Sequence, residues 1–170
     1  IAASIVVLLL GNGFFSGSEI AIISARRSRI EGLIADGSRA ASRVKALQDD
    51  MDQFLATVQI GVTVCGTLAG VLGGFLASRY LEPALSGAAF ARFVPPAIVA
   101  SALVGLSIVY VELVLGELVP KALALRYAEQ IALLVSAPFR LMERSSRWIV
   151  DFLAASTRLV LRVFGIREAG

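Results

Sequence analysis

The sequence contains three long stretches that are almost free of charged residues. Residues 1–25 include one charge, Glu19, whereas residues 53–78 and 93–111 include none. A helix needs roughly 20 apolar residues to cross the hydrocarbon core of a bilayer, and each stretch is about that long. We therefore predict an all-α membrane protein with three transmembrane helices, at about 1–25, 53–78 and 94–118.

The composition agrees with this prediction and excludes several functions. Of the 170 residues, 57% are hydrophobic and 17% are charged, against about 25% charged residues in soluble domains. The chain has no histidine and one cysteine, Cys65, which excludes an intramolecular disulfide and the Ser-His or Cys-His pairs of many hydrolases. Because no nucleophile and base pair or cofactor motif is present, we expect no enzymatic activity. The net charge of +3 gives no reason to expect a nucleic-acid partner.

Lysine and arginine are distributed unevenly between the segments that connect the spans. Six basic residues lie in 26–52, two lie in 79–92, and eight follow the third span. Cytoplasmic segments of membrane proteins are enriched in these residues. We therefore expect a multi-pass protein of the bacterial inner (plasma) membrane, with the N-terminus outside and with 26–52 and the C-terminus in the cytoplasm.

The segments on the expected cytoplasmic side, 26–52 and 121–165, have helical patterns but carry many charges. In the first of them apolar residues recur at helical spacing, and Gly37 separates two short helices. In the second, Trp148 and other apolar residues alternate with basic ones, which predicts an amphipathic helix in contact with membrane lipid. The alternative is a fourth span at 130–153, and the charged residues in its middle argue against it.

Each span carries polar residues that share one helical face, because residues four or seven apart lie on the same side of a helix. These sets are Asn12, Ser16 and Glu19 in the first span, Gln59, Thr63 and Thr67 in the second, and Glu112, Gly116 and the adjoining Glu117 in the third. Ionisable groups inside a membrane are costly and usually mark ion or substrate pathways. Single serines and threonines, in contrast, commonly bond to their own helix or to a neighbour. We expect the three polar faces to converge on one site.

Residues that weaken a regular helix accompany these polar faces. Pro120 has no N–H, so the carbonyl of Gly116 loses its helical partner, and we expect the third helix to be broken between Glu112 and Glu117. The three glycines of "GNGFFSG" are expected to loosen the first span near Asn12. Interrupted helices at membrane depth line cavities or coordinate ions. We therefore interpret this polar stretch as half of a cation site.

All candidate ligands are oxygen atoms of carboxylate, amide, hydroxyl or carbonyl groups. Such ligands bind hard cations, including Mg²⁺, Ca²⁺ and Na⁺, and counting them does not separate Mg²⁺ from Ca²⁺. Two other interpretations stay open at this point. One is an exporter of organic cations such as diamines, for which Tyr110 is the nearby aromatic residue of the third span. The other is a membrane anchor or regulator whose acidic residues pair with Arg26, Arg27 or Lys121.

Three motifs resemble those of a known family. The stretches "FFSGSEIAIISARRSRIEGL", "TVQIGVTVCGTLAG" and "GELVPKALALRYAE" resemble the transmembrane domain of the CorC/cyclin M (CNNM) proteins, often labelled hemolysin-like. The resemblance implies that 1–170 form one such domain, with three transmembrane helices, cytoplasmic juxtamembrane helices, a belt-like amphipathic helix and a homodimeric assembly. It also implies transport of Mg²⁺, mainly its export driven by Na⁺ entry. Family members usually continue into cytoplasmic CBS-type regulatory domains, so this chain is expected to be the membrane domain alone.

The resemblance also implies which residues hold the ion. Carried over position by position, the Mg²⁺ site consists of Asn12, Ser16, Thr63, Glu112, Gly116 and Glu117. Glu19 belongs to the first motif and is expected either to hold Na⁺ or to orient the cytoplasmic arginines. Two positions depart from the family pattern: the second span reads "GVT" where many members have asparagines after the glycine, and Asn12 stands where serine is common. These departures bear on Mg²⁺ selectivity rather than on the presence of a cation site.

Overall fold

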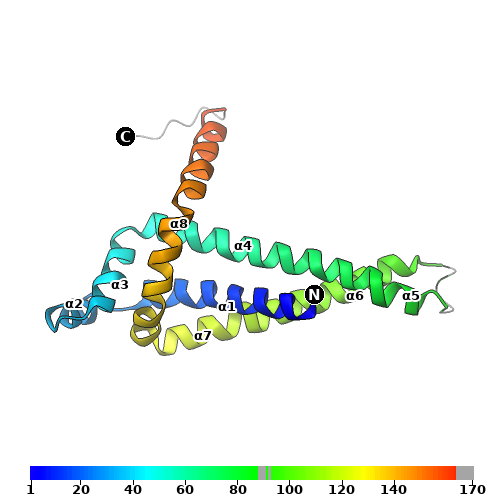
Figure 1. Cartoon of the computed structure of the whole chain (residues 1–170), viewed down its shortest axis with the longest axis horizontal. Coiled ribbons are helices and arrows are strands. Elements are labelled where there is room, and N and C mark those ends of the chain that lie inside the picture. The colour runs from blue at the N-terminus through cyan, green and yellow to red at the C-terminus, as the bar shows by residue number, and fades with distance from the viewer. Residues whose placement is uncertain (88–90, 92, 164–170) are drawn as a thin grey trace.

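The computed structural model describes residues 1–87, 91 and 93–163, and the regular elements in them are all helices. Three of its helical segments are long and apolar enough to cross a bilayer: Ala2–Ser24, Met51–Leu85 and Pro96–Arg126. They run side by side along the long axis of the molecule (Figure 1). The predicted all-α fold with three transmembrane helices is confirmed.

The second and third spans each contain a wide helical turn. The first span is the single helix α1 (Ala2–Ser24). The second consists of α4 (Met51–Leu76), the π-helical segment η1 (Ala77–Leu81) and α5 (Glu82–Leu85). The third consists of α6 (Pro96–Leu113), the π-helical turn η3 (Val114–Leu118) and α7 (Val119–Arg126).

Two expectations about helix interruption were wrong. The third span is not broken between Glu112 and Glu117, because η3 continues it into α7 without leaving helical geometry. A π-helical turn bonds each carbonyl to the N–H five residues on, and this turn ends directly before α7, whose first turn contains Pro120. The first span is also an unbroken helix, so its glycines do not loosen it.

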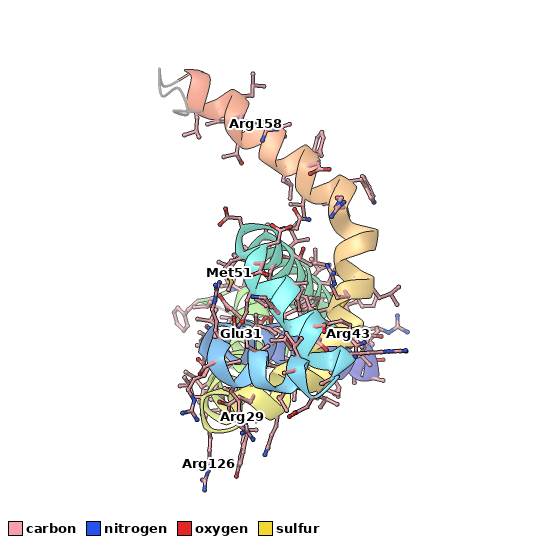
Figure 2. The ribbon with its side chains drawn as sticks, turned by 90° about the vertical axis from the view of Figure 1, so that its left-hand side faces the viewer. Arg29, Glu31, Arg43, Met51, Arg126 and Arg158 are labelled. Atoms are coloured by element: carbon pink, nitrogen blue, oxygen red, sulfur yellow. The ribbon has the colours of Figure 1, made fainter. Side chains whose placement is uncertain are left out.

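Two short helices cover the end of the bundle at which α1 ends. They are α2 (Arg27–Ala35) and α3 (Arg39–Asp49), and Gly37 in the turn between them has a φ of +84°, which a residue with a side chain rarely adopts. The Ser38 hydroxyl caps α3 by accepting a hydrogen bond from Ala41 N at 3.3 Å. Arg29, Arg43 and Arg126 lie around this end in Figure 2. We call it the basic end.

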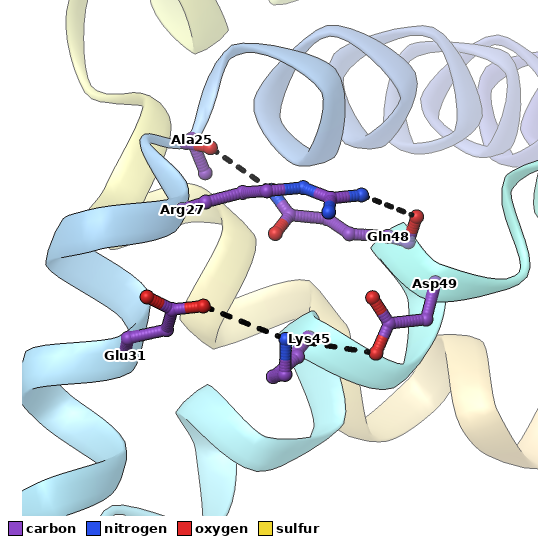
Figure 3. Close-up of polar contacts among 6 residues, drawn as sticks. All are labelled: Ala25, Arg27, Glu31, Lys45, Gln48 and Asp49. Carbon is purple, nitrogen blue, oxygen red and sulfur yellow. Dashed lines mark hydrogen bonds and ion pairs between the residues drawn. The ribbon is translucent and has the colours of Figure 1, made fainter.

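A buried glutamine joins the basic end to the first span. Gln48 of α3 donates hydrogen bonds from Nε2 to Ile22 O and to Ala25 O, both at 2.9 Å. Ile22 lies in the last turn of α1 and Ala25 is its C-cap residue, and at this end the helix has no N–H groups left to pair with the carbonyls. Arg27 Nη2 donates to Gln48 O at 3.3 Å, as Figure 3 shows. The end of α1 is therefore fixed to α3 by side-chain hydrogen bonds.

Aromatic rings fill the core near the basic end. Phe139 lies 4.9 Å from Phe54 and 5.7 Å from Phe14, measured between ring centroids. Phe54 and Phe139 are fully buried. Because Phe139 belongs to α8 (Ala128–Val163), the contact holds the first part of α8 against α1 and α4.

The rest of α8 leaves the bundle. Its orange to red part extends away from the spans in Figure 1. Trp148 and Phe152 there are exposed, and Trp148 is 71% exposed. The segment 130–153 therefore does not run alongside the three spans. Arg92 and Arg167, which entered the orientation prediction, lie outside the described residues, and the side of the membrane that the basic end faces stays a prediction.

Candidate cation site

Asn12 of α1 is the most unusual polar residue inside the bundle. Its side chain is 3% exposed, and its Oδ1 atom is buried without a hydrogen-bond partner anywhere in the described residues. Leaving a buried acceptor unpaired costs about 1–3 kcal/mol. A buried carbonyl oxygen of this kind is a ready ligand for a hard cation.

Gly116 brings Asn12 and Glu112 together. A Cβ atom on Gly116 would lie 3.0 Å from Asn12 Nδ2 and 3.6 Å from Glu112 Cγ. The two side chains therefore flank one glycine of η3, although they come from different helices. Larger residues at this position would push the amide of Asn12 away from the carboxylate-bearing side chain.

The carboxylate of Glu112 reaches across to the second span. A Cβ atom on Gly66 of α4 would lie 2.6 Å from Glu112 Oε1. Gly66 was not among the predicted site residues, because its role depends on which face of α4 meets α6. The three spans therefore meet at these residues: Asn12 in α1, Gly66 in α4, and Glu112 and Gly116 in the third span.

Two more glycines let the first span approach η3 and α7 closely. A Cβ on Gly13 would lie 3.1 Å from Pro120 Cγ and 3.4 Å from Leu115 O, and a Cβ on Gly17 would lie 3.3 Å from Pro120 Cβ. These glycines are four residues apart, which is the small-xxx-small spacing of close helix pairs in membranes. That spacing is the sequence signal for this contact, whereas the expectation from the sequence was that these glycines loosen the helix.

The remaining predicted ligands differ in how far they are buried. Ser16 is buried on α1, one turn beyond Asn12. Glu19 is partly buried and has no ion pair within the described part of the chain. Thr63 is exposed on α4, as are Gln59 and Thr67. The polar face of α4 thus looks outward from the bundle, while that of α1 looks inward.

Glu117 already has a cationic partner. Lys121 Nζ lies 2.6 Å from Glu117 Oε1 and donates a hydrogen bond to it. Among the described residues, three or more acidic, histidine or cysteine side chains do not gather at one point. A cation here would therefore need amide, hydroxyl or backbone oxygens in addition to carboxylates.

The family described as the cyclin M transmembrane N-terminal domain matches residues 3–170. The chain belongs to this CorC/CNNM family. Membership is consistent with a membrane role related to cation transport, and the chain is a multi-pass membrane protein.

Curated members of the family include bacterial proteins of greater length. UPF0053 protein sll0260 of Synechocystis is 42% identical over 162 residues, which cover 95% of this chain and 36% of the relative. UPF0053 protein YhdT of Bacillus subtilis is 35% identical, with coverage of 96% and 35%. UPF0053 inner membrane protein YfjD of Escherichia coli is 30% identical, with coverage of 92% and 33%. The chain spans about a third of the length of these CNNM relatives.

Proposed function

We propose that this CNNM domain carries Mg²⁺ across the membrane through a site between its three spans. The observation that carries the proposal is the unpaired, buried Oδ1 of Asn12, whose side chain flanks Gly116 together with that of Glu112. Native proteins rarely leave such an acceptor without a partner, so each instance calls for an explanation. A cation held between the amide oxygen and the Glu112 carboxylate supplies one.

The chemistry of the ligands supports a hard ion. Histidine is absent from the chain and Cys65 is its one cysteine, so oxygen atoms provide the ligands. Mg²⁺ requires about six oxygens in a compact octahedral arrangement and commonly keeps several waters. The resemblance to CorC/CNNM proteins favours Mg²⁺ over Ca²⁺ and favours export coupled to Na⁺ entry.

The membrane setting and the assembly are also proposals. The relative from Escherichia coli is named an inner membrane protein, and the arginines of the basic end favour a cytoplasmic location for that end. We expect a homodimer, as the resemblance to the family implies, and the third span is largely exposed within the single chain. The dimer and the membrane lipid would share that surface.

The two alternative interpretations receive unequal support. Tyr110 is 69% exposed, so it does not offer an aromatic wall inside the bundle for an organic cation. The ion pair between Glu117 and Lys121 is what an anchor protein would show at Glu117. Glu112 has no such ion pair within the described residues. It is therefore the better residue with which to test transport.

The test is cation-dependent thermal stabilisation of the purified protein with Glu112→Gln beside the unchanged chain. A cation at 100 times its Kd stabilises the folded state by about 2.7 kcal/mol. We expect Mg²⁺ to raise the melting temperature, and we expect Glu112→Gln to remove most of that rise. Glu82→Gln is the matched control, because Glu82 lies in α5 at the opposite end of the bundle from α2 and α3.

Ca²⁺, Na⁺ and putrescine are measured in parallel. A response to putrescine alone would favour the organic-cation exporter. No response to any of the four, or an equal loss in both variants, would contradict a cation site at Glu112. A selective Mg²⁺ response would justify flux measurements in proteoliposomes.

A further inference from the structure

The ion pair between Glu117 and Lys121 lies at the edge of the candidate cation site. Its N–O distance is 2.6 Å, whereas the other ion pairs of the described residues measure 3.1, 3.6 and 3.8 Å. The pair connects η3 to α7. Glu117 directly follows Gly116, the residue that Asn12 and Glu112 flank. Lys121 thus neutralises one of the two carboxylates that a cation would approach.

The Lys121 side chain points toward Glu117, in the preceding helical turn, rather than toward the basic end. Both residues belong to the span Pro96–Arg126, and Lys121 lies near its basic end. A lysine at that depth commonly extends toward the nearer membrane surface, where its ammonium is hydrated. Here the side chain turns toward the preceding helical turn, and hence away from the basic end, to reach Glu117.

The two side chains are neither fully exposed nor fully buried. Lys121 is 31% exposed and Glu117 is 40% exposed in the single chain. Because neither side chain is fully buried, a cation that enters the site can reach the Glu117 carboxylate in place of the ammonium group. An ammonium group and a metal cation cannot both lie against the same carboxylate oxygen, because their charges repel.

We propose that Lys121 is a tethered competitor for the cation site: its ammonium group occupies Glu117 and must leave before Glu117 can bind the transported cation. The proposal rests on the proposed function of the same site. In this scheme Lys121 sets the affinity of the site for the cation. When the cation leaves, the Lys121 ammonium group pairs again with the Glu117 carboxylate and balances its negative charge. Lys121 thus determines the affinity of the site and is not a ligand.

The test is a double-variant cycle on the purified protein, read by calorimetric titration with Mg²⁺ and, separately, with Na⁺. Lys121→Met removes the ammonium and keeps a side chain of similar length. We expect it to tighten binding about two- to fivefold, which corresponds to the loss of an ion pair of ordinary strength. Lys121→Arg, which keeps the charge, is expected to bind as the unchanged chain does.

The cycle separates local competition from a general change in charge. In a Glu117→Gln background, Lys121→Met is expected to change affinity no further, because the competitor has lost its carboxylate. Arg126→Met removes one positive charge at the end of the same helix, where the guanidinium lies 5.5 Å from the centroid of the Tyr127 ring. It is expected to leave affinity unchanged.

The possible outcomes distinguish this proposal from the proposed function. Binding by the unchanged chain with no response to Lys121→Met, or with weaker binding in that variant, would overturn the competitor role alone. An equal response in the Glu117→Gln background would also overturn it. If neither the unchanged chain nor Lys121→Met binds Mg²⁺ or Na⁺, both the site and its competitor are wrong.

Discussion

Gly66 leaves room on α4 for the Glu112 carboxylate, while Gly70, four residues further along the same helix, faces open space. The two glycines therefore provide matched positions with different surroundings. At Gly66 an added methyl group meets the far end of a flexible side chain, so the helix can keep its place while the carboxylate moves. At Gly70 an added methyl group meets nothing.

We predict that Gly66→Ala weakens Mg²⁺ binding without unfolding the protein. The expected loss is roughly 10- to 100-fold, the range found when a residue that positions a ligand is changed. Gly70→Ala is expected to bind normally and to be slightly more stable, since alanine is the better helix former. Calorimetric titration measures the first effect and thermal unfolding the second. Normal binding by Gly66→Ala would contradict the position that we assign to the Glu112 carboxylate.

The sequence predicted the residues of the first and third spans at this site, but it did not predict Gly66 of α4. Asn12, Glu112 and Gly116 were identified because polar residues in an apolar helix are conspicuous. Gly66 was missed because glycine carries no chemistry of its own and its importance comes from a neighbour on another helix. Thr63 was chosen for its hydroxyl, yet it is exposed on α4, and its part in a site stays a prediction.

At the scale of helices, the connection between α1 and α3 depends on one amide group. Gln48 is buried and donates hydrogen bonds to two carbonyls at the C-terminal end of α1, those of Ile22 and the C-cap residue Ala25. Gln53 at the start of α4 provides a contrast, because its Nε2 is buried without a hydrogen-bond partner in the described chain. The Nε2 of Gln48 therefore has two hydrogen-bond acceptors, whereas the Nε2 of Gln53 has none in the described chain.

We predict opposite effects when each glutamine is replaced by methionine, which has a similar shape. Gln48→Met removes two hydrogen bonds from buried carbonyls and should lower the free energy of unfolding by about 1–3 kcal/mol. Gln53→Met removes a donor that has no partner and should be neutral or stabilising. Thermal unfolding of both variants in detergent tests the pair. Equal destabilisation would show that Gln48 acts only by filling space.

Helix boundaries followed from the sequence more readily than helix geometry did. The turn at Gly37 and the two short helices on either side of it were predicted, because glycine and the change of pattern mark them. Pro120 predicts a disturbance of the third span, and the structure has a π-helical turn there rather than the expected break. In lipid an interrupted helix exposes unpaired backbone groups, so a wide turn that keeps most of them paired is preferred.

At the scale of the whole molecule, α8 lies apart from the bundle and exposes apolar side chains along its second half. Trp148 is among them, and it is the one tryptophan in the chain. Its fluorescence therefore reports on this helix alone. If the exposed face rests in the membrane interface, the indole ring lies among lipid headgroups and upper acyl chains.

We predict that brominated lipids quench Trp148 fluorescence in proteoliposomes and that iodide in the buffer quenches it weakly. The reference is the same protein unfolded in denaturant, in which iodide should quench strongly. Strong iodide quenching in the folded protein, with no effect of brominated lipid, would place this half of α8 in water. That result would contradict the amphipathic-helix prediction made from the sequence.

The number and place of the spans followed from the sequence because lipid imposes a length and a composition on them. The assembly did not follow, since a face that is apolar enough for lipid is also apolar enough for a second copy. Orientation rests on counts of arginine and lysine, and homodimer formation rests on the resemblance; both stay predictions.

The attachment of α1 at its end has a mechanical consequence. Asn12 lies 13 residues from Ala25, where Gln48 holds the chain, and this corresponds to a lever arm of about 20 Å along a helix. A tilt of about 5° around that pivot would displace Asn12 by roughly 1.7 Å. Metal–ligand distances are defined to within about 0.2 Å, so a small swing of α1 would be enough to assemble or dismantle the coordination shell.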